Sequence, residues 1–275
     1  MPWFGPGILI LLAINVLAVF APGDSVVRIS GLKFPAQTVY KPLLLLSGGF
    51  VLWLLFLRRC VFTFPVRLRT LPALGRLTTL QFALLLTAMA GAVYLPSLQV
   101  NFQHYDWTHR HISASLTSLA AFGRLFVTPQ PDGMYRPLTF ISLWADYRLF
   151  GDQLWGYHFQ GIALHMLNAG LVGVLAVRLG MARPAGRLAA LVFGVASIHF
   201  EAVVWPAARF DLLATTFTCL ALIFFLQFWR AEGVRLGHAS ICLLSFTAAV
   251  LNKETAYSAV LVIAALVATH RLWKL

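Results

Sequence analysis

Long apolar runs separated by short polar segments dominate the hydrophobic pattern of this 275-residue chain. Such runs are typical of helices that cross or enter a membrane, although several are shorter than the roughly 20 residues that span a bilayer as one straight helix. The runs cover residues 4–22, 41–57, 77–95, 155–177, 188–199, 212–229, 238–251 and 257–269. We therefore predict an all-α integral membrane protein, a polytopic bundle of about eight transmembrane helices.

The two short runs that end at His199 and Leu251 need a separate explanation. They must either extend into flanking polar residues or break inside a protein-lined cavity, where irregular backbone is tolerated. Both end beside acidic residues, Glu201 and Glu254. The pattern thus predicts polar breaks at these two places.

A long polar segment, residues 96–153, separates the third and fourth apolar runs and is large for a loop between membrane helices. It begins with a group of polar, aromatic and titratable residues at 101–111, and apolar residues then recur with a helical period over residues 112–126. This periodicity predicts an amphipathic helix at the membrane surface. We expect the loop to lie against the outer leaflet.

The amino-acid composition is typical of a protein that lies in a lipid bilayer. Hydrophobic residues make up 60% of the chain and charged residues 11%, and the mean hydropathy is +0.80. The net charge of +12 would fit a nucleic-acid-binding protein only if the basic residues formed a soluble face. Here they lie between apolar runs, so we exclude nucleic acid as a partner. The positive-inside bias of membrane proteins explains the excess.

The order of the runs places the basic clusters on one side of the membrane and most acids on the other. Eight of the nine carboxylates fall on the side opposite the basic clusters, and only Glu232 falls with them. The positive-inside rule makes the basic side cytoplasmic, so we predict an outward-facing polar site in a bacterial inner membrane. The four clusters are Arg58, Arg59, Arg67, Arg69 and Arg76; Arg178, Arg183 and Arg187; Arg230 and Arg235; and Arg271 and Lys274.

A series of short motifs carries a family resemblance. The motifs are Tyr135-Arg-Pro-Leu, Trp155-Gly-Tyr-His with His165 and Asn168, His199-Phe-Glu-Ala-Val-Val-Trp, Arg209-Phe-Asp-Leu-Leu and Asn252-Lys-Glu-Thr-Ala. Read in this order, residues 77–270 resemble the membrane region of polyprenol-dependent glycosyltransferases of the GT-C type, and are most similar to the transmembrane-and-tetratricopeptide O-mannosyltransferases. No 34-residue tetratricopeptide period is visible. The resemblance divides the chain into residues 1–76, with two additional helices and a basic cytoplasmic loop, and residues 77–275, a GT-C-like region.

The resemblance implies transfer of a sugar, with mannose a candidate, from a polyprenyl-phosphate donor to a protein or glycan acceptor outside the cytoplasm, with inversion at the anomeric carbon. It places the catalytic acid at Asp106. The family often shows two adjacent acids there, whereas Trp107 follows Asp106 in this chain. We therefore assign no metal ligand and no certain cofactor, and leave a divalent metal open.

The residues themselves support the same chemistry. An inverting transfer from a glycosyl phosphate needs a carboxylate to deprotonate the acceptor hydroxyl and cations to stabilise the departing phosphate. Asp106 is the first candidate for the base and Glu201 the second. Arginine can bind phosphate in bidentate fashion and lysine as a point charge. The predicted substrate-binding residues are Arg136, His158, His199, Arg209, Asp211, Lys253 and Glu254.

Structural roles and other functions remain as alternatives. A noncatalytic or truncated membrane scaffold of the same fold is one, and a transporter of lipids or small solutes is another, although transporters favour inverted repeats that this sequence does not display. The structural alternatives are a solvated loop acid at Asp106, a charge network of Glu201, Arg209 and Asp211, interhelical hydrogen bonds from His158, His165 and Asn168, and a Lys253–Glu254 ion pair that closes a helix end.

Overall fold

The computed structural model describes residues 26–29, 32–35, 72–128, 135–230 and 236–273, and the chain divides into two compact units, residues 1–67 and 68–275. The described part of the first unit is a two-stranded antiparallel hairpin, β1 (Val26–Ile29) and β2 (Leu32–Pro35). This hairpin departs from the all-α prediction. The two predicted N-terminal membrane helices, at 4–22 and 41–57, lie outside the described residues.

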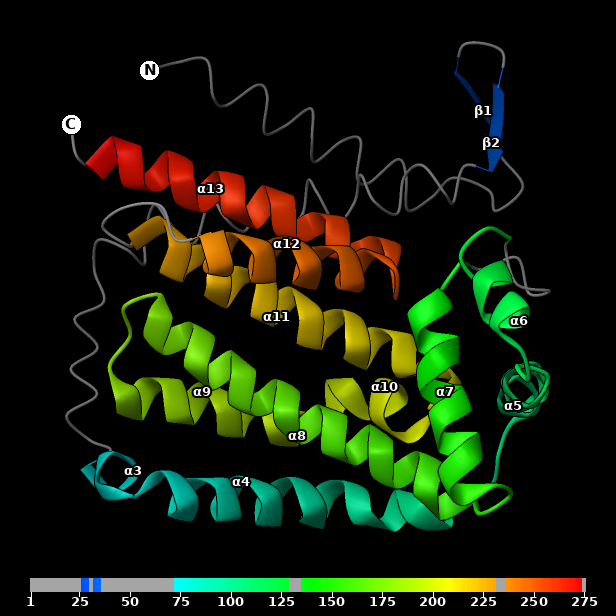
Figure 1. Cartoon of the computed structure of the whole chain (residues 1–275). Coiled ribbons are helices and arrows are strands. Elements are labelled where there is room, and N and C mark those ends of the chain that lie inside the picture. The colour runs from blue at the N-terminus through cyan, green and yellow to red at the C-terminus, as the bar shows by residue number, and fades with distance from the viewer. Residues whose placement is uncertain (1–25, 30–31, 36–71, 129–134, 231–235, 274–275) are drawn as a thin grey trace. The chain divides into compact units, whose positions relative to one another are not determined.

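The described part of the second unit is helical, and each of its six predicted apolar runs coincides with a helix or a pair of helices (Figure 1). The elements are α3 (Pro72–Arg76), α4 (Thr79–Tyr94), η1 (Leu95–Gln99), α5 (His104–Ala114), α6 (Leu119–Arg124), α7 (Pro137–Phe150), α8 (Leu154–Arg178), α9 (Arg183–Val195), η2 (Ser197–His199), α10 (Phe200–Val204), η3 (Pro206–Ala208), α11 (Arg209–Arg230), α12 (Leu236–Val250), η4 (Glu254–Tyr257) and α13 (Ser258–Trp273).

Three described helical segments are long and apolar enough to cross a membrane: Thr79–Gln99, Leu154–Arg178 and Pro206–Arg230. A fourth span results if Arg183–Val195 and Ser197–Val204, which meet at a 50° bend, are taken together. Helix α12 and the segment Glu254–Val267 are apolar but shorter. Within the described residues the structure thus supports three or four spans, fewer than the six that the sequence predicted for this part. The predicted polar breaks are present after α9 and after α12.

Helix α8 packs closely against its neighbours at glycines. A Cβ atom added to Gly173 would lie 2.9 Å from the backbone oxygen of Gly186, and one added to Gly161 would lie 2.7 Å from the backbone oxygen of Val203. Small residues allow helix backbones to approach in this way, and membrane bundles rely on such packing. The contacts hold α9 and the broken segment after it against α8.

The described residues of the predicted basic clusters lie at one end of the bundle. Figure 1 shows α5, α6 and α7 together at one end, whereas α3 and the turn between α8 and α9 lie at the other. At the latter end Arg187 Nη1 donates to Leu77 O at 2.9 Å, and Arg230 Nη1 donates to Arg178 O at 2.6 Å. The described basic residues of the first three predicted clusters, from Arg76 to Arg230, therefore lie at the end opposite α5 and α7.

The predicted amphipathic helix over 112–126 is not one helix. Helix α5 ends at Ala114, and α6 begins only after Ser118, whose hydroxyl accepts a hydrogen bond from Ala121 N at 3.2 Å. The Ser115 hydroxyl donates to Ile112 O at 2.7 Å. Serine side chains that bond to nearby backbone compete with helix continuation, which explains the interruption. Residues 137–150, which belong to the predicted outer loop, form α7.

Candidate functional site

A mixed polar and apolar pocket of about 450 Å³ lies where the break after α9 meets the first turns of α11 and the turn before η4. We call it the polar pocket. Four of the predicted site residues line it: His199 from η2, Glu201 from α10, Asp211 from α11 and Lys253 from the segment after α12. Residues from three distant segments are thus brought together. His165 and Thr215 line it as well.

Lys253 forms an ion pair with Asp211, so the predicted Lys253–Glu254 pair is wrong. The two side chains are 20% and 37% exposed, which leaves both accessible from the pocket. Lysine 253 Nζ also lies 4.9 Å from the centre of the Phe210 ring. Glu254 instead faces Arg136, with 3.9 Å between Oε2 and Nη2.

The Phe210 ring connects the two cations beside the pocket. Arg136 Cζ lies 3.6 Å from the centre of this ring, so Phe210 makes one cation–π contact with Arg136 and another with Lys253. Arg136 immediately precedes α7, whose first residue is Pro137, and proline is well suited to a helix start because it lacks the N–H that would have no partner there. The start of α7 therefore brings the Arg136 guanidinium to the start of α11.

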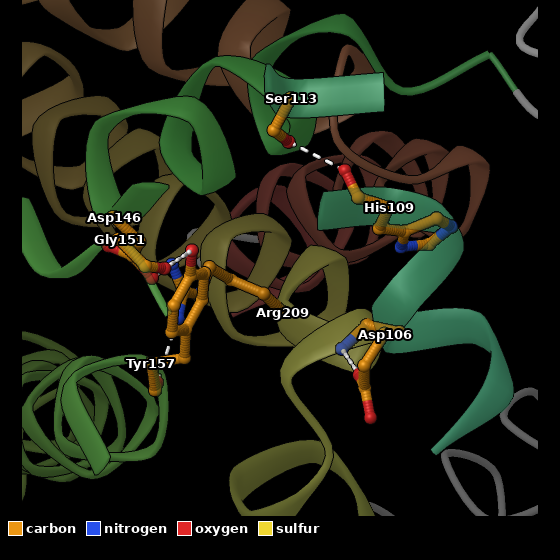
Figure 2. Close-up of polar contacts among 8 residues, drawn as sticks. Asp106, His109, Ser113, Asp146, Gly151, Tyr157 and Arg209 are labelled. Carbon is orange, nitrogen blue, oxygen red and sulfur yellow. Dashed lines mark hydrogen bonds and ion pairs between the residues drawn. The ribbon is translucent and has the colours of Figure 1, made fainter. Parts of the chain in front are cut away.

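Asp106 is buried rather than a solvated loop acid, because only 3% of its surface is exposed. Its Oδ2 accepts from Gln103 N at 2.8 Å and completes the capping box of α5, and its Oδ1 accepts from Ala207 N at 2.7 Å. Burial raises the pKa of this carboxyl, while the two backbone N–H groups and the nearby His158 and His109 act in the opposite direction. The hydrogen bond from Ala207 N to Asp106 links α5 to η3, which immediately precedes α11 (Figure 2).

A second, fully buried ion pair joins α7 to α11. Arg209 is 1% exposed and Asp146 is 0% exposed, and their side chains are in direct contact. Arg209 Nη2 also donates to Tyr157 O at 2.9 Å (Figure 2). Burial raises the pKa of Asp146 to about 6, and contact with the Arg209 guanidinium limits the rise.

The partner of Arg209 is therefore Asp146, and the predicted network of Arg209 with Glu201 and Asp211 is wrong. Sequence reasoning counted Asp146 only as one acid among eight. Asp146 lies four residues before the end of α7, and nothing in the sequence around it indicates that its partner is Arg209, 63 residues away. That Arg209 contacts substrate stays a prediction.

The histidines of α8 make interhelical contacts. His158 Nε2 donates to Val100 O at 2.8 Å, and His165 Nε2 donates to Gly194 O at 3.0 Å; a carbonyl only accepts, so both Nε2 atoms carry the proton. Asn168 donates to Leu212 O at 2.9 Å and accepts from the Thr216 hydroxyl at 2.7 Å. The predicted interhelical hydrogen bonds are present for His165 and Asn168, whereas His158 bonds to the segment between η1 and α5; that His158 contacts substrate stays a prediction.

No group of three or more His, Cys, Asp or Glu side chains among the described residues has an arrangement that would hold a metal ion. In the polar pocket the two carboxylates, Glu201 and Asp211, are accompanied by the Lys253 ammonium, which competes for the same negative charge. The carboxylate oxygens of this set can accept hydrogen bonds from hydroxyl groups of a ligand, and the Lys253 ammonium can donate to it.

Comparison with known proteins finds a partial relationship. No protein-family profile matches the chain, and no solved structure matches it. A stretch of 120 residues, 38% of the chain, is 32% identical to a human protein named Protein O-mannosyl-transferase TMTC4. The matched stretch covers 16% of that protein's length. The chain is therefore similar to a part of this O-mannosyl-transferase, a limited similarity that agrees with the resemblance of the motifs.

Proposed function

We propose that this protein is a membrane glycosyltransferase that moves a sugar, with mannose the first candidate, from a polyprenyl-phosphate donor to a protein or glycan acceptor. The observation that carries the proposal is the convergence of His199, Glu201, Asp211 and Lys253 on one pocket. The name of the human relative, an O-mannosyl-transferase, supports the same class of reaction. The reaction is proposed to invert the anomeric carbon.

The cations beside the pocket suit a phosphate. In our proposal the Lys253 ammonium binds the donor phosphate. Arg136, which also contacts the Phe210 ring, adds a second positive charge that attracts the phosphate. Asp211 holds Lys253 in place before the donor arrives. His199 and Glu254 are proposed to contact the polar part of the substrates. Arg209 and His158, both buried, are proposed to act by positioning α11 and α8.

Two carboxylates can serve as the base that deprotonates the acceptor hydroxyl. Glu201 is exposed and lines the pocket, whereas Asp106 is held rigidly by two backbone N–H groups and has a raised pKa. Fixed position and a pKa shifted toward neutrality both favour general-base catalysis. Asp106 is anchored to Ala207, four residues before the pocket residue Asp211. We propose Asp106 as the base and Glu201 as the second candidate.

The proposed site faces outward. Asp106, Asp211 and Glu254 gather near the same end of the bundle, opposite the described basic clusters, and the positive-inside rule assigns the basic end to the cytoplasm. The proposed location is a bacterial inner membrane. The proposed donor then lies in the outer leaflet.

Paired substitutions test the function and the base together. Asp106→Asn and Glu201→Gln each remove one carboxylate, and transfer from radiolabelled polyprenyl-phosphate mannose to a peptide or glycan acceptor is measured for both variants and the parent. Removing a general base costs roughly 10² to 10⁴ in rate, so Asp106→Asn is expected to lose at least about a hundredfold. Glu201→Gln is expected to retain more than a third of the parent rate.

Asp106 also has a structural task, and the controls must separate it from catalysis. Asparagine keeps one side-chain oxygen acceptor for the backbone, and the thermal midpoint and donor affinity of each variant are measured in the same detergent. A lost rate with unchanged donor affinity and thermal midpoint identifies Asp106 as the base. A lost rate in Glu201→Gln alone transfers that role to Glu201. A parent protein that transfers no sugar contradicts the proposed function and favours the noncatalytic scaffold.

A further inference from the structure

The end of α9 leaves backbone carbonyls that the helix itself cannot satisfy. The last four carbonyls of an α-helix have no N–H partner within it, and the interior of a membrane bundle offers little water to replace one. At the break after α9, Gly194 belongs to the last turn of the helix and Ala196 is its C-terminal cap. Donors for these two carbonyls must therefore come from outside α9.

Side chains of two other helices supply such donors. The Tyr94 hydroxyl, at the end of α4, donates to Ala196 O at 2.8 Å. His165 Nε2, in α8, donates to Gly194 O at 3.0 Å. Both side chains are completely buried, and their rings meet edge to face with centres 5.0 Å apart. Buried donors from α4 and α8 thus hold the chain at the break.

The Ala196 carbonyl also reaches the polar pocket through the backbone. Its oxygen accepts from His199 N at 3.2 Å, and because a carbonyl oxygen has two lone pairs, it can accept this bond and the one from Tyr94 together. The His199 ring lies 4.2 Å from the ring of Phe193, centre to centre, and both residues line the polar pocket. One carbonyl therefore links a helix outside the pocket to a residue in its wall.

We propose that Tyr94 is a positioning residue of the polar pocket: its hydroxyl fixes the Ala196 carbonyl, which in turn places His199 in the pocket wall. Tyr94 does not line the pocket, so it acts without touching the ligand. Its ring packs in a core with Ile162, Val203 and Leu212, and phenylalanine would fill that core equally well. The hydroxyl is thus the group that makes the link. The effect on substrate rests on the proposed function, whereas the anchoring of the break rests on these contacts alone.

A second tyrosine of the same bundle provides a matched control. Tyr157 is 1% exposed, and its hydroxyl donates to Gly151 O at 2.9 Å. Tyr157→Phe and Tyr94→Phe therefore remove the same kind of hydrogen bond from equally buried rings. The bond of Tyr157 lies at the turn between α7 and α8, and neither of its residues lines the polar pocket. A difference between the two variants reports on the place of the bond rather than on its loss.

The first measurement needs no ligand. Hydrogen exchange of residues 196–204 is followed by mass spectrometry on the full-length protein in detergent. Loss of one hydrogen bond is expected to speed exchange about two- to tenfold in Tyr94→Phe, because local opening becomes easier. Tyr157→Phe is expected to leave this segment at the parent rate. Equal exchange of residues 196–204 in the parent and in Tyr94→Phe overturns the proposal.

Two unnatural side chains at position 94 complete this test. The amino group of para-aminophenylalanine can donate to Ala196 O, so this residue is expected to restore the parent rate of exchange. The thermal midpoint shows whether each variant folds. If Tyr94→Phe does not fold, para-fluorophenylalanine replaces it, since the fluorine fills the place of the hydroxyl and donates no hydrogen bond. Exchange that stays fast with the amino group present contradicts the role of the hydroxyl as donor.

The second measurement asks whether Tyr94 acts through His199. Binding of polyprenyl-phosphate mannose is followed by fluorescence in the parent and in a His199→Ala background. Tyr94→Phe is expected to weaken binding about fivefold in the parent and less than about twofold when the imidazole is already absent, because residues that act through one another are not additive. Equal weakening in both backgrounds, or the same weakening by Tyr157→Phe, overturns the link to His199.

The two measurements separate this role from the proposed reaction. A parent protein that binds no donor contradicts the proposed function, and the exchange of residues 196–204 still decides whether Tyr94 anchors the break. Full donor binding and sugar transfer in a Tyr94→Phe variant with unchanged exchange supports the glycosyltransferase and overturns the positioning role.

Discussion

Two ion pairs at the start of α11 differ in their exposure to solvent. Arg209 pairs with Asp146 where neither side chain is more than 1% exposed, whereas Asp211 pairs with Lys253 where the side chains are 37% and 20% exposed. The two α11 residues are only two positions apart, so they point in different directions from the helix. The buried pair joins α11 to α7, and the half-exposed pair lines the polar pocket.

This difference in exposure indicates different roles: the buried pair stabilises the fold, and the half-exposed pair is available to bind a ligand. A buried ion pair is costly to break, because removing one partner leaves the other charge without solvent or counterion. A half-exposed pair contributes little to stability, since water screens both charges. We therefore expect substitutions at Arg209 to act on the fold and substitutions at Lys253 to act on ligand binding.

The largest expected effect follows from Arg209→Met. This variant removes the guanidinium beside Asp146 and the hydrogen bond to Tyr157 O, and is expected to lower the free energy of unfolding by about 3–5 kcal/mol. Unfolding in detergent, followed by circular dichroism, measures the loss. The double variant Arg209→Met with Asp146→Leu removes both charges and is expected to recover a large part of it. A single variant as stable as the parent would contradict a supporting role for the pair.

A smaller effect is expected for Lys253→Met, which keeps the length of the side chain and removes its charge. Binding of polyprenyl-phosphate mannose, followed by fluorescence, is expected to weaken about tenfold, or about 1.4 kcal/mol, with stability within about 1 kcal/mol of the parent. Arg148→Met, at an exposed position on α7, removes one positive charge away from the pocket and serves as the control. Equal weakening in both variants would indicate general attraction to the basic chain rather than a phosphate site.

The smallest effect concerns pH. The raised pKa of Asp146, about 6 in the folded protein against an ordinary value of 3.8, means that the folded state binds this proton more tightly than the unfolded state. Its contribution to stability is therefore complete below about pH 4 and is lost as the pH rises through 6. Between pH 7 and pH 5 the folded protein is expected to gain about 1 kcal/mol from this group. Unfolding at the two values, with Asp146→Asn as the control in which this gain disappears, provides the measurement.

Several elements of the second unit could be predicted from hydrophobic periodicity alone. The apolar runs at 77–95, 155–177 and 212–229 coincide with α4, α8 and α11, because sustained apolar sequence without charges favours a helix whose backbone groups bond internally. The polar breaks near Glu201 and Glu254 could be predicted in the same way. The helices of the outer segment could not be predicted, because α5, α6 and α7 are short. Hydrogen bonds made by the side chains of Ser115 and Ser118 decide where α5 ends and α6 begins.

Sequence by itself determined the chemistry available to this protein: apolar helices, a basic end, and a set of acids and cations near helix breaks. It did not determine partners. Only the tertiary structure decided that Arg209 meets Asp146 and that Lys253 meets Asp211, because the sign and spacing of charges in one chain allow many pairings and helix packing selects among them. The same packing placed Phe193 and His199 in the lining of the polar pocket, on either side of the 50° bend after α9.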